Sequence, residues 1–230
     1  MINIKRLTFN PQNENTYIIS DETKECLIID CGCFSPGDQY MLASYVDVHN
    51  LRPVGAICTH LHLDHICGNG FINRRFGLKP EAHTDDEYLM GVAHYQALAL
   101  GIEEDNLEFP RVDCHLKEND IVHFGQTELT VIHTPGHSLG SISLYSRADS
   151  VIFTGDTLMR GTIGTYRLPG GDQEQLVDSI KNKLFQLPYN VMVFPGHGEI
   201  TTIGYERANN EEVNRPIDKT LRVRKLKFKS

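Results

Sequence analysis

The 230-residue sequence contains no tryptophan, no long apolar run and no excess of basic residues. No segment approaches the roughly 18–20 apolar residues of a membrane-spanning helix, so we expect no membrane span. Residues 1–20 lack the apolar core and the cleavage site of a secretory signal. The net charge of −8 disfavours nucleic acids and anionic membranes as partners, because both require a basic surface. We therefore expect a cytoplasmic protein that binds neither nucleic acid nor membrane.

The six cysteines lack the paired CxxC spacing of a structural zinc site. We interpret them as buried thiols of a reducing compartment. Cys31 and Cys33 lie at the end of a predicted strand, so contact between this pair and a functional site stays open.

Hydrophobic patterning predicts strands, helices, strands, a helix and a strand, in two halves of similar plan. Ser35 is the predicted N-cap of the first helix, with Pro36 in its first turn. This order of strands and helices favours an α/β fold in which two sheets pack face to face and helices cover their outer faces. We expect a single domain over 1–230. The predicted strands are 2–9, 15–20, 26–32, 53–60, 120–125, 128–136, 141–146, 149–156 and 190–198, and the predicted helices are 35–51, 85–101 and 173–187. The acidic segment 102–108 is predicted to be a loop.

The C-terminal residues 218–230 differ in composition, since six of these thirteen residues are basic. Apolar residues alternate with basic ones from Val223 to Phe228. We interpret this tail as an edge strand or a solvated chain end rather than a patch for nucleic acid or an acidic partner.

The segment ICTHLHLDHICGN (57–69) places His60, His62, Asp64 and His65 directly after an apolar strand. This pattern fits neither a zinc finger nor an HExxH helix. In an extended segment His60 and His62 point the same way, and Asp64 and His65 turn toward a second centre. Imidazoles suit zinc, iron or nickel, and a carboxylate extends the choice to manganese.

In three later segments an apolar strand likewise ends at a turn that contains glycine and one side chain able to bind a metal ion. The three side chains are His137 in HTPGHSLG, Asp156 in FTGDT and His197 in FPGHG. Their separations indicate loops at one rim of a folded domain, so we predict that all seven residues coordinate metal. The remaining histidines are interpreted as capping or surface residues, and these are His49, His83, His94, His115, His123 and His133.

Together, THLHLDH, TPGHSLGSISLY, TGDT and PGHG resemble the motifs of the metallo-β-lactamase superfamily over nearly the whole chain. GDTLMRGTIGTYRLPGGD and GHGEITTIGYERANN are similar to the glyoxalase II-like (hydroxyacylglutathione hydrolase-like) branch. The resemblance implies a four-layer αβ/βα sandwich of two mixed sheets with helices on the outer faces. The chain resembles a short form, because only 33 residues follow His197, where full-length glyoxalase II carries a helical domain.

The resemblance also implies a role for each ligand. His60, His62 and His137 would bind a first metal, Asp64, His65 and His197 a second, and Asp156 would bridge the two. Seven ligands with one shared carboxylate leave an open position on each ion for a bridging water, as catalytic sites require. We expect two divalent ions, with zinc first and iron or manganese as alternatives.

The implied activity is hydrolysis of a small thioester or ester, with a bridging hydroxide as nucleophile. Asp64 and Asp156 are the predicted catalytic residues, and Asp64 would also help to move the proton. Tyr166, Arg167 and Arg207 are candidate substrate residues, although Arg207 equally fits a role in anchoring the last helix. An aspartate at position 156 separates the chain from many β-lactamases of the superfamily.

One alternative belongs to a different class. Persulfide dioxygenases share the implied fold and use one iron held by two histidines and an aspartate, which here would be His60, His137 and Asp156. The metal, the acyl and thiol groups of the substrate and the oligomeric state are left open by the sequence.

Overall fold

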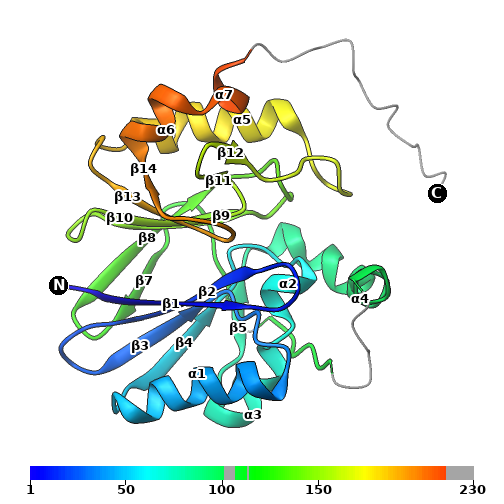
Figure 1. Cartoon of the computed structure of the whole chain (residues 1–230), viewed down its shortest axis with the longest axis vertical. Helices are drawn as coiled ribbons and strands as arrows, with labels where there is room; N and C mark the ends of the chain where they lie inside the picture. Colours follow the sequence, from blue (N-terminus) through cyan, green and yellow to red (C-terminus); the bar gives the residue numbers. More distant parts are fainter. Residues whose placement is uncertain (101–106, 113, 216–230) are drawn as a thin grey trace.

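The computed structural model describes residues 1–100, 107–112 and 114–215. Two six-stranded sheets pack face to face, and helices cover the outer face of each (Figure 1). From bottom to top in that view the layers are α1 with α3, the N-terminal sheet, the C-terminal sheet, and α5 with α6 and α7. The predicted αβ/βα sandwich is therefore confirmed.

The N-terminal sheet has the strand order β1-β2-β3-β4-β5-β6. β1, β2 and β3 are antiparallel, whereas β3, β4, β5 and β6 run parallel. The carboxyl ends of the parallel strands consequently meet at one edge of the sandwich. The bounds are β1 Asn3–Phe9, β2 Glu14–Ser20, β3 Glu25–Ile29, β4 Arg52–Ile57, β5 Pro80–Ala82 and β6 Cys114–His115.

The C-terminal sheet has the order β14-β13-β10-β9-β8-β7, in which only β10 and β13 are parallel. A separate hairpin, β11-β12, follows β10. The bounds are β7 Ile121–Phe124, β8 Thr127–His133, β9 Ile142–Ser146, β10 Val151–Gly155, β11 Leu158–Met159, β12 Thr162–Ile163, β13 Met192–Pro195 and β14 Thr201–Thr202.

The helices lie outside the sheets or along the edge where the parallel strands end. Their bounds are α1 Pro36–Val48, α2 Leu63–Ile66, α3 Asn69–Phe76, η1 Thr84–Val92, α4 Ala93–Leu100, α5 Gln173–Asn182, η3 Leu184–Gln186, α6 Ile203–Asn209 and α7 Glu211–Asn214. Ser35 caps α1 as predicted, since its side chain accepts a hydrogen bond from the Asp38 amide in a capping box.

Alternate residues of the inner strands enter different cores, because successive side chains of a strand point to opposite faces. Leu27 and Ile29 of β3 join the core between the sheets, whereas Cys26 and Ile28 join the core under α1 and α3. Such strands are buried on both faces, which explains their nearly continuous apolar sequence.

Two predicted helices differ from the structure. The segment predicted as one helix over 85–101 is a 3₁₀ helix, η1, followed by α4, and η1 begins with a bond between residues three apart, from the Asp86 amide to the His83 carbonyl at 3.2 Å. The helix predicted over 173–187 ends as α5 at Asn182 and continues as η3. Helix α3 was not predicted, although Gly77 ends it in the left-handed conformation with φ 73°.

Gly101, most of the predicted loop 102–108 and the tail 218–230 lie outside the described residues. Across the residues that the structure does describe, no helix combines the length and the apolarity needed to cross a bilayer.

We expect Phe153→Ala to lower the free energy of unfolding by about 3–5 kcal/mol, because it leaves a cavity in the core between the sheets. Phe153 is 0% exposed and packs edge to face on Tyr17 at a centroid distance of 5.2 Å. Denaturant unfolding measures the loss. The control Tyr40→Ala removes an aromatic ring that is 75% exposed and should change stability by no more than about 0.5 kcal/mol. Equal losses in both variants would contradict this core assignment.

Candidate metal centre

Three histidines converge where β4 and β8 end. His137 Nε2 lies 2.8 Å from His62 Nδ1 and 3.2 Å from His60 Nε2. A tetrahedral zinc ion with nitrogen bonds of about 2.0–2.1 Å would hold its ligand atoms about 3.3 Å apart. The three rings are buried, and together they form the first cluster. Its spacing therefore fits a single metal ion.

Hydrogen bonds on the far side of two rings direct their lone pairs inward. His137 Nδ1 lies 2.7 Å from the Thr165 carbonyl, which can only accept, so Nε2 carries the lone pair. Thr59 Oγ1 donates to Asp30 Oδ2, so it accepts from His60 Nδ1 at 3.1 Å. The His60 and His137 lone pairs thus face each other in a buried space, an arrangement that a cation stabilises.

A second cluster, Asp64, His65 and His197, lies beside the first. Asp64 Oδ2 is 3.3 Å from His197 Nε2 and 3.8 Å from His65 Nε2. His65 Nε2 is among the buried polar atoms that have no hydrogen-bond partner in the described part of the chain. Leaving such an atom unpaired costs free energy, and a metal bond would satisfy it.

Asp156 lies between the two clusters. Its Oδ1 is 2.8 Å from His197 Nδ1 and 3.7 Å from His65 Nε2, while its Oδ2 is 3.8 Å from His137 Nε2. One oxygen of the Asp156 carboxylate thus faces each cluster, as expected of a carboxylate that bridges two metal ions. The assignment of ligand roles to the seven residues stays a prediction that this arrangement supports.

Glycine allows the strands that carry these ligands to approach closely. A Cβ on Gly196 would lie 2.4 Å from Asp156 Oδ1 and 2.6 Å from His65 Cε1. Gly155, with φ 48°, would bring a Cβ to 2.2 Å from Thr59 Oγ1. A side chain at either position would displace the ligands or their supports.

The pKa shifts of the ionisable groups differ between the two clusters. Burial and the neighbouring His137 lower the pKa of His62 to about 3, so this ring is neutral. Burial alone would lower the pKa of His197, but its hydrogen bonds to Asp156 and Asp64 raise it to about 9. Burial alone would raise the pKa of Asp156, but His65 and His197 hold it well below its usual range. The second cluster therefore holds protons that the first does not.

The sequence analysis missed two carboxylates that support the ligands. Asp30 accepts from the Thr59 amide at 2.6 Å and contacts His65 Nδ1 at 3.1 Å. Asp30 directly follows β3. The pattern that identified the ligands, a metal-binding side chain at the end of a strand, therefore applies to it as well. Supports of this kind orient metal-binding imidazoles.

The other missed residue is Asp86, which is 0% exposed. It accepts from the Leu61 amide at 3.1 Å, the Ser138 hydroxyl at 2.8 Å and the Gly140 amide at 2.6 Å. It thereby joins the loop of His60 and His62 to the loop of His137. No local sequence signal marks it, because its partners come from distant segments.

The three candidate substrate residues lie in different surroundings. Tyr166 and Arg167 directly follow Thr165, whose carbonyl contacts His137, and Arg167 is exposed. Arg207 donates to the Phe185 carbonyl at 2.7 Å, and its guanidinium lies 4.5 Å from the centre of the Tyr189 ring. These contacts are those of a residue that anchors α6.

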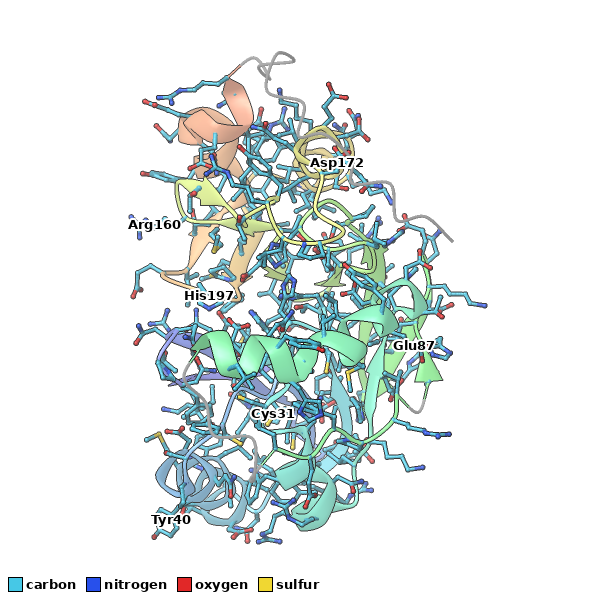
Figure 2. The ribbon with its side chains drawn as sticks, turned by 90° about the vertical axis from the view of Figure 1, so that its right-hand side faces the viewer. Cys31, Tyr40, Glu87, Arg160, Asp172 and His197 are labelled. Atoms are coloured by element: carbon cyan, nitrogen blue, oxygen red, sulfur yellow. The ribbon has the colours of Figure 1, made fainter. Side chains whose placement is uncertain are left out.

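The cysteines are free thiols, and all except Cys114 are buried. Cys31 Sγ lies 3.5 Å from Cys33 Sγ, close to Gly68 at the start of α3. Figure 2, which faces the edge with the metal centre, places His197 between the two halves and Cys31 below it. The described hydrogen bonds link neither thiol to the seven ligands.

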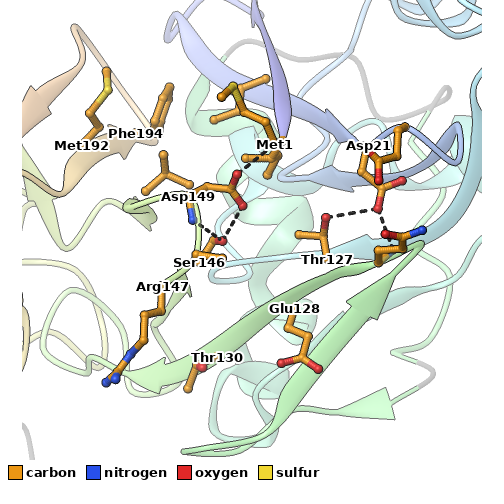
Figure 3. A pocket seen from close by; sticks show the side chains of 16 residues that line it. Met1, Asp21, Thr127, Glu128, Thr130, Ser146, Arg147, Asp149, Met192 and Phe194 are labelled. Carbon is orange, nitrogen blue, oxygen red and sulfur yellow. Dashed lines mark hydrogen bonds between the residues drawn. The ribbon is translucent and has the colours of Figure 1, made fainter.

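The edge with the metal centre is open to solvent. The side chains of Asp64, Asp156 and His197 are 16%, 13% and 23% exposed. A cavity of about 1030 Å³ lies at the other end of the sandwich, where its lining includes the starts of β8, β10 and β13 (Figure 3). The ligands follow the carboxyl ends of these strands, so this cavity is separate from the metal centre. Histidine and cysteine are absent from its lining as described.

The family model of the metallo-beta-lactamase superfamily matches residues 9–197. Hydroxyacylglutathione hydrolase GloC of Haemophilus influenzae is 30% identical over 220 residues, which cover 93% of this chain and 99% of GloC. The chain belongs to this superfamily and to its glyoxalase II-like branch, among metal-dependent hydrolases. The predicted resemblance is confirmed.

Two solved structures share the fold over most of the chain. One is the BLEG-1 B3 metallo-beta-lactamase, with a TM-score of 0.81, 30% identity and coverage of 94% of this chain and 100% of BLEG-1. The other is TTHA1623 in a di-iron-bound form, with a TM-score of 0.79, 32% identity and coverage of 90% of this chain and 98% of TTHA1623.

We expect Asp30→Asn to weaken metal binding at the second cluster by about 10–100-fold, because Asp30 orients His65. Competition with a chromophoric chelator measures the affinity of each ion. Asp178→Asn on the exposed face of α5 is the control. Unchanged affinity for both ions in Asp30→Asn would refute the supporting role.

The affinity of the second cluster for its ion should rise by at least about tenfold per pH unit between pH 6 and 9, because His197, whose pKa is raised to about 9, must lose its proton to bind. His65 must also lose a proton, since Asp64 and Asp156 raise its pKa against the effect of burial. Above about pH 4, His62 has no proton to lose, so its protonation does not make binding at the first cluster pH-dependent. Calorimetry at pH 7 in buffers of different ionisation enthalpy should show proton release for one ion. Release accompanying neither ion would contradict the assignment.

Proposed function

We propose that the chain is a dinuclear metal-dependent hydrolase of a small thioester or ester. The observation that carries this proposal is the pair of converging three-ligand clusters with the Asp156 carboxylate between them. A centre that binds ions only for structure needs no partly exposed ligands, whereas this one has three at the solvent-facing edge.

His60, His62 and His137 would hold one ion, Asp64, His65 and His197 the other, and Asp156 would contact both. When bound, such ions supply Lewis acidity and bring the pKa of a water molecule toward neutrality. Zinc is the proposed ion, because imidazole and carboxylate ligands in a four-coordinate set suit it. The di-iron form of TTHA1623 makes iron the second ion to compare.

The protein's own groups provide a place for the proton released in hydrolysis. The neighbouring His65 and His197 lower the pKa of Asp64, against the effect of burial, so its carboxylate is ionised at neutral pH. Asp64 is also in contact with solvent at the open edge. It can therefore accept a proton beside the centre and pass it to water.

The segment after β12 is the proposed substrate-facing loop. A Cβ on Gly164 would lie 2.0 Å from the Asp156 carbonyl and 2.8 Å from His137 Nδ1, so the loop packs directly on two ligands. Tyr166, two residues further on, packs against the core beneath α5, and the guanidinium of the exposed Arg167 lies 6.0 Å from the centre of its ring. The similarity to GloC supports a thioester, and Arg167 offers a cation for an anionic thiol portion.

We expect Asp156→Ala to lower kcat/KM for thioester hydrolysis by at least about 10²-fold, because it removes the group shared by both clusters. The assay releases free thiol from a panel of short acyl thioesters, and a thiol reagent detects it. Asp178→Ala is the matched control and should retain full activity. Thermal melting checks that both variants are folded.

The panel also separates the competing functions. Hydrolysis of a chromogenic cephalosporin faster than of any thioester would replace the proposal with β-lactam hydrolysis. Oxygen uptake with a persulfide, together with about one equivalent of iron per chain, would replace it with the mononuclear-iron oxygenase. Near wild-type thioester turnover by Asp156→Ala would overturn the site itself.

A further inference from the structure

A third group of ligand-type side chains lies outside the seven residues of the metal centre. It comprises His83, which directly follows β5, Asp85 in η1 and His133 at the end of β8. One ligand atom from each residue lies within 4.8 Å of the others. The two imidazole rings stack face to face, with centroids 4.1 Å apart and planes 7° apart.

Hydrogen bonds identify the nitrogens that carry lone pairs. His133 Nε2 lies 2.9 Å from the Leu139 carbonyl, which only accepts, so the lone pair is on His133 Nδ1. The lone pair of His83 Nδ1 accepts from the Asp85 amide at 3.2 Å as the N-cap of η1, and this nitrogen lies 3.8 Å from Asp85 Oδ2. An ion bound to His83 Nδ1 would replace the hydrogen bond from the Asp85 amide. The ring of His133 is thus held by a carbonyl on its far side, as metal-binding histidines are.

The protonation and exposure of the group also suit an ion. Burial and the adjacent His133 lower the pKa of His83, so this ring is neutral at pH 7. The Asp85 side chain is 55% exposed, which leaves an entry path from solvent. The nearby Lys117 and His115 oppose any cation here, so the affinity has to come from coordinate bonds to the imidazoles and the carboxylate rather than from the local charge.

We propose that His83, Asp85 and His133 form a separate site for a borderline-soft divalent cation such as zinc, nickel, cobalt or copper. Two imidazoles and one carboxylate form the donor set that these ions prefer, whereas magnesium and calcium prefer oxygen ligands. Bonds of about 2.0–2.2 Å to zinc draw the three ligand atoms together through rotation of their side chains. The exposed Asp85 carboxylate has the freedom for this movement.

An ion at the proposed site would stabilise the loops that carry the ligands of the first cluster. Asp85 precedes Asp86, which joins the two loops of the first cluster. His133 bonds the carbonyl of Leu139, in the loop that carries His137. An ion bound here links η1 to the end of β8, the two segments that hold this loop in place.

The test is the number of zinc equivalents bound per chain at saturation, measured by equilibrium dialysis and elemental analysis. The holoprotein, His133→Gln and Asp85→Asn are compared with His123→Gln, an exposed histidine of β7 outside the group. We expect the holoprotein and His123→Gln to bind about one equivalent more than His133→Gln. Asp85→Asn should lower the affinity for this ion about tenfold or more.

The test depends on the difference in zinc equivalents between the variants. It is therefore valid whether the main metal centre binds one ion or two. Asp85→Asn alters an exposed side chain and guards against loss of folding in His133→Gln. Excess zinc should also raise the Tm of the holoprotein more than that of Asp85→Asn. Equal zinc stoichiometry in the holoprotein and His133→Gln, with equal affinity in Asp85→Asn, overturns the proposed site.

Discussion

The crowding of buried imidazoles and carboxylates at one edge of the sandwich is the constraint on which the rest of the structure depends. Four of the five histidines in the centre are nearly inaccessible to solvent, and burial of polar groups costs free energy unless they are paired. In the described chain the rings face one another at hydrogen-bond distance, with lone pairs directed inward. The surrounding structure holds them in an arrangement that a bound cation stabilises.

Supports outside the ligand set maintain this arrangement. Asp30 connects the end of β3 to the Thr59 amide and to His65, and Asp86 connects the loops that follow β4 and β8. The partners of Asp30 lie in the loop that follows β4, whereas Asp86 accepts hydrogen bonds from both halves, so it cannot move without breaking contacts in each. The glycines at 155 and 196 allow the same segments to approach within van der Waals distance. Ligand geometry is therefore a property of the joined loops rather than of any single motif.

Strand direction explains why the chemistry lies at one end. β4, β8, β10 and β13 all deliver ligands from their carboxyl ends, and the parallel β5 ends at His83 on the same side. The cavity at the opposite end is lined by the starts of three of these strands and has no histidine among its described lining residues. A single architectural feature thus places the candidate metal centre and the proposed third cation site along one edge. Asp85 and Asp86 are adjacent in sequence, but Asp85 belongs to the proposed third site and Asp86 joins the loops of the first cluster.

The sequence by itself determined which segments form buried strands and that Ser35 caps the first helix. It also determined that side chains able to bind metal follow several strands. Each of these features depends on residues close together in the chain. The fold class and superfamily followed from the same local motifs. Asp86 and the pairing of His83 with His133 could not be found this way, since their partners lie 25–54 residues and 50 residues away. The 3₁₀ geometry of η1 was not predicted either, and its first turn is closed by the bond from the Asp86 amide to the His83 carbonyl. Only the packed sheets bring such groups within bonding distance, and hydrogen bonds and metal bonds depend on that distance rather than on separation along the chain.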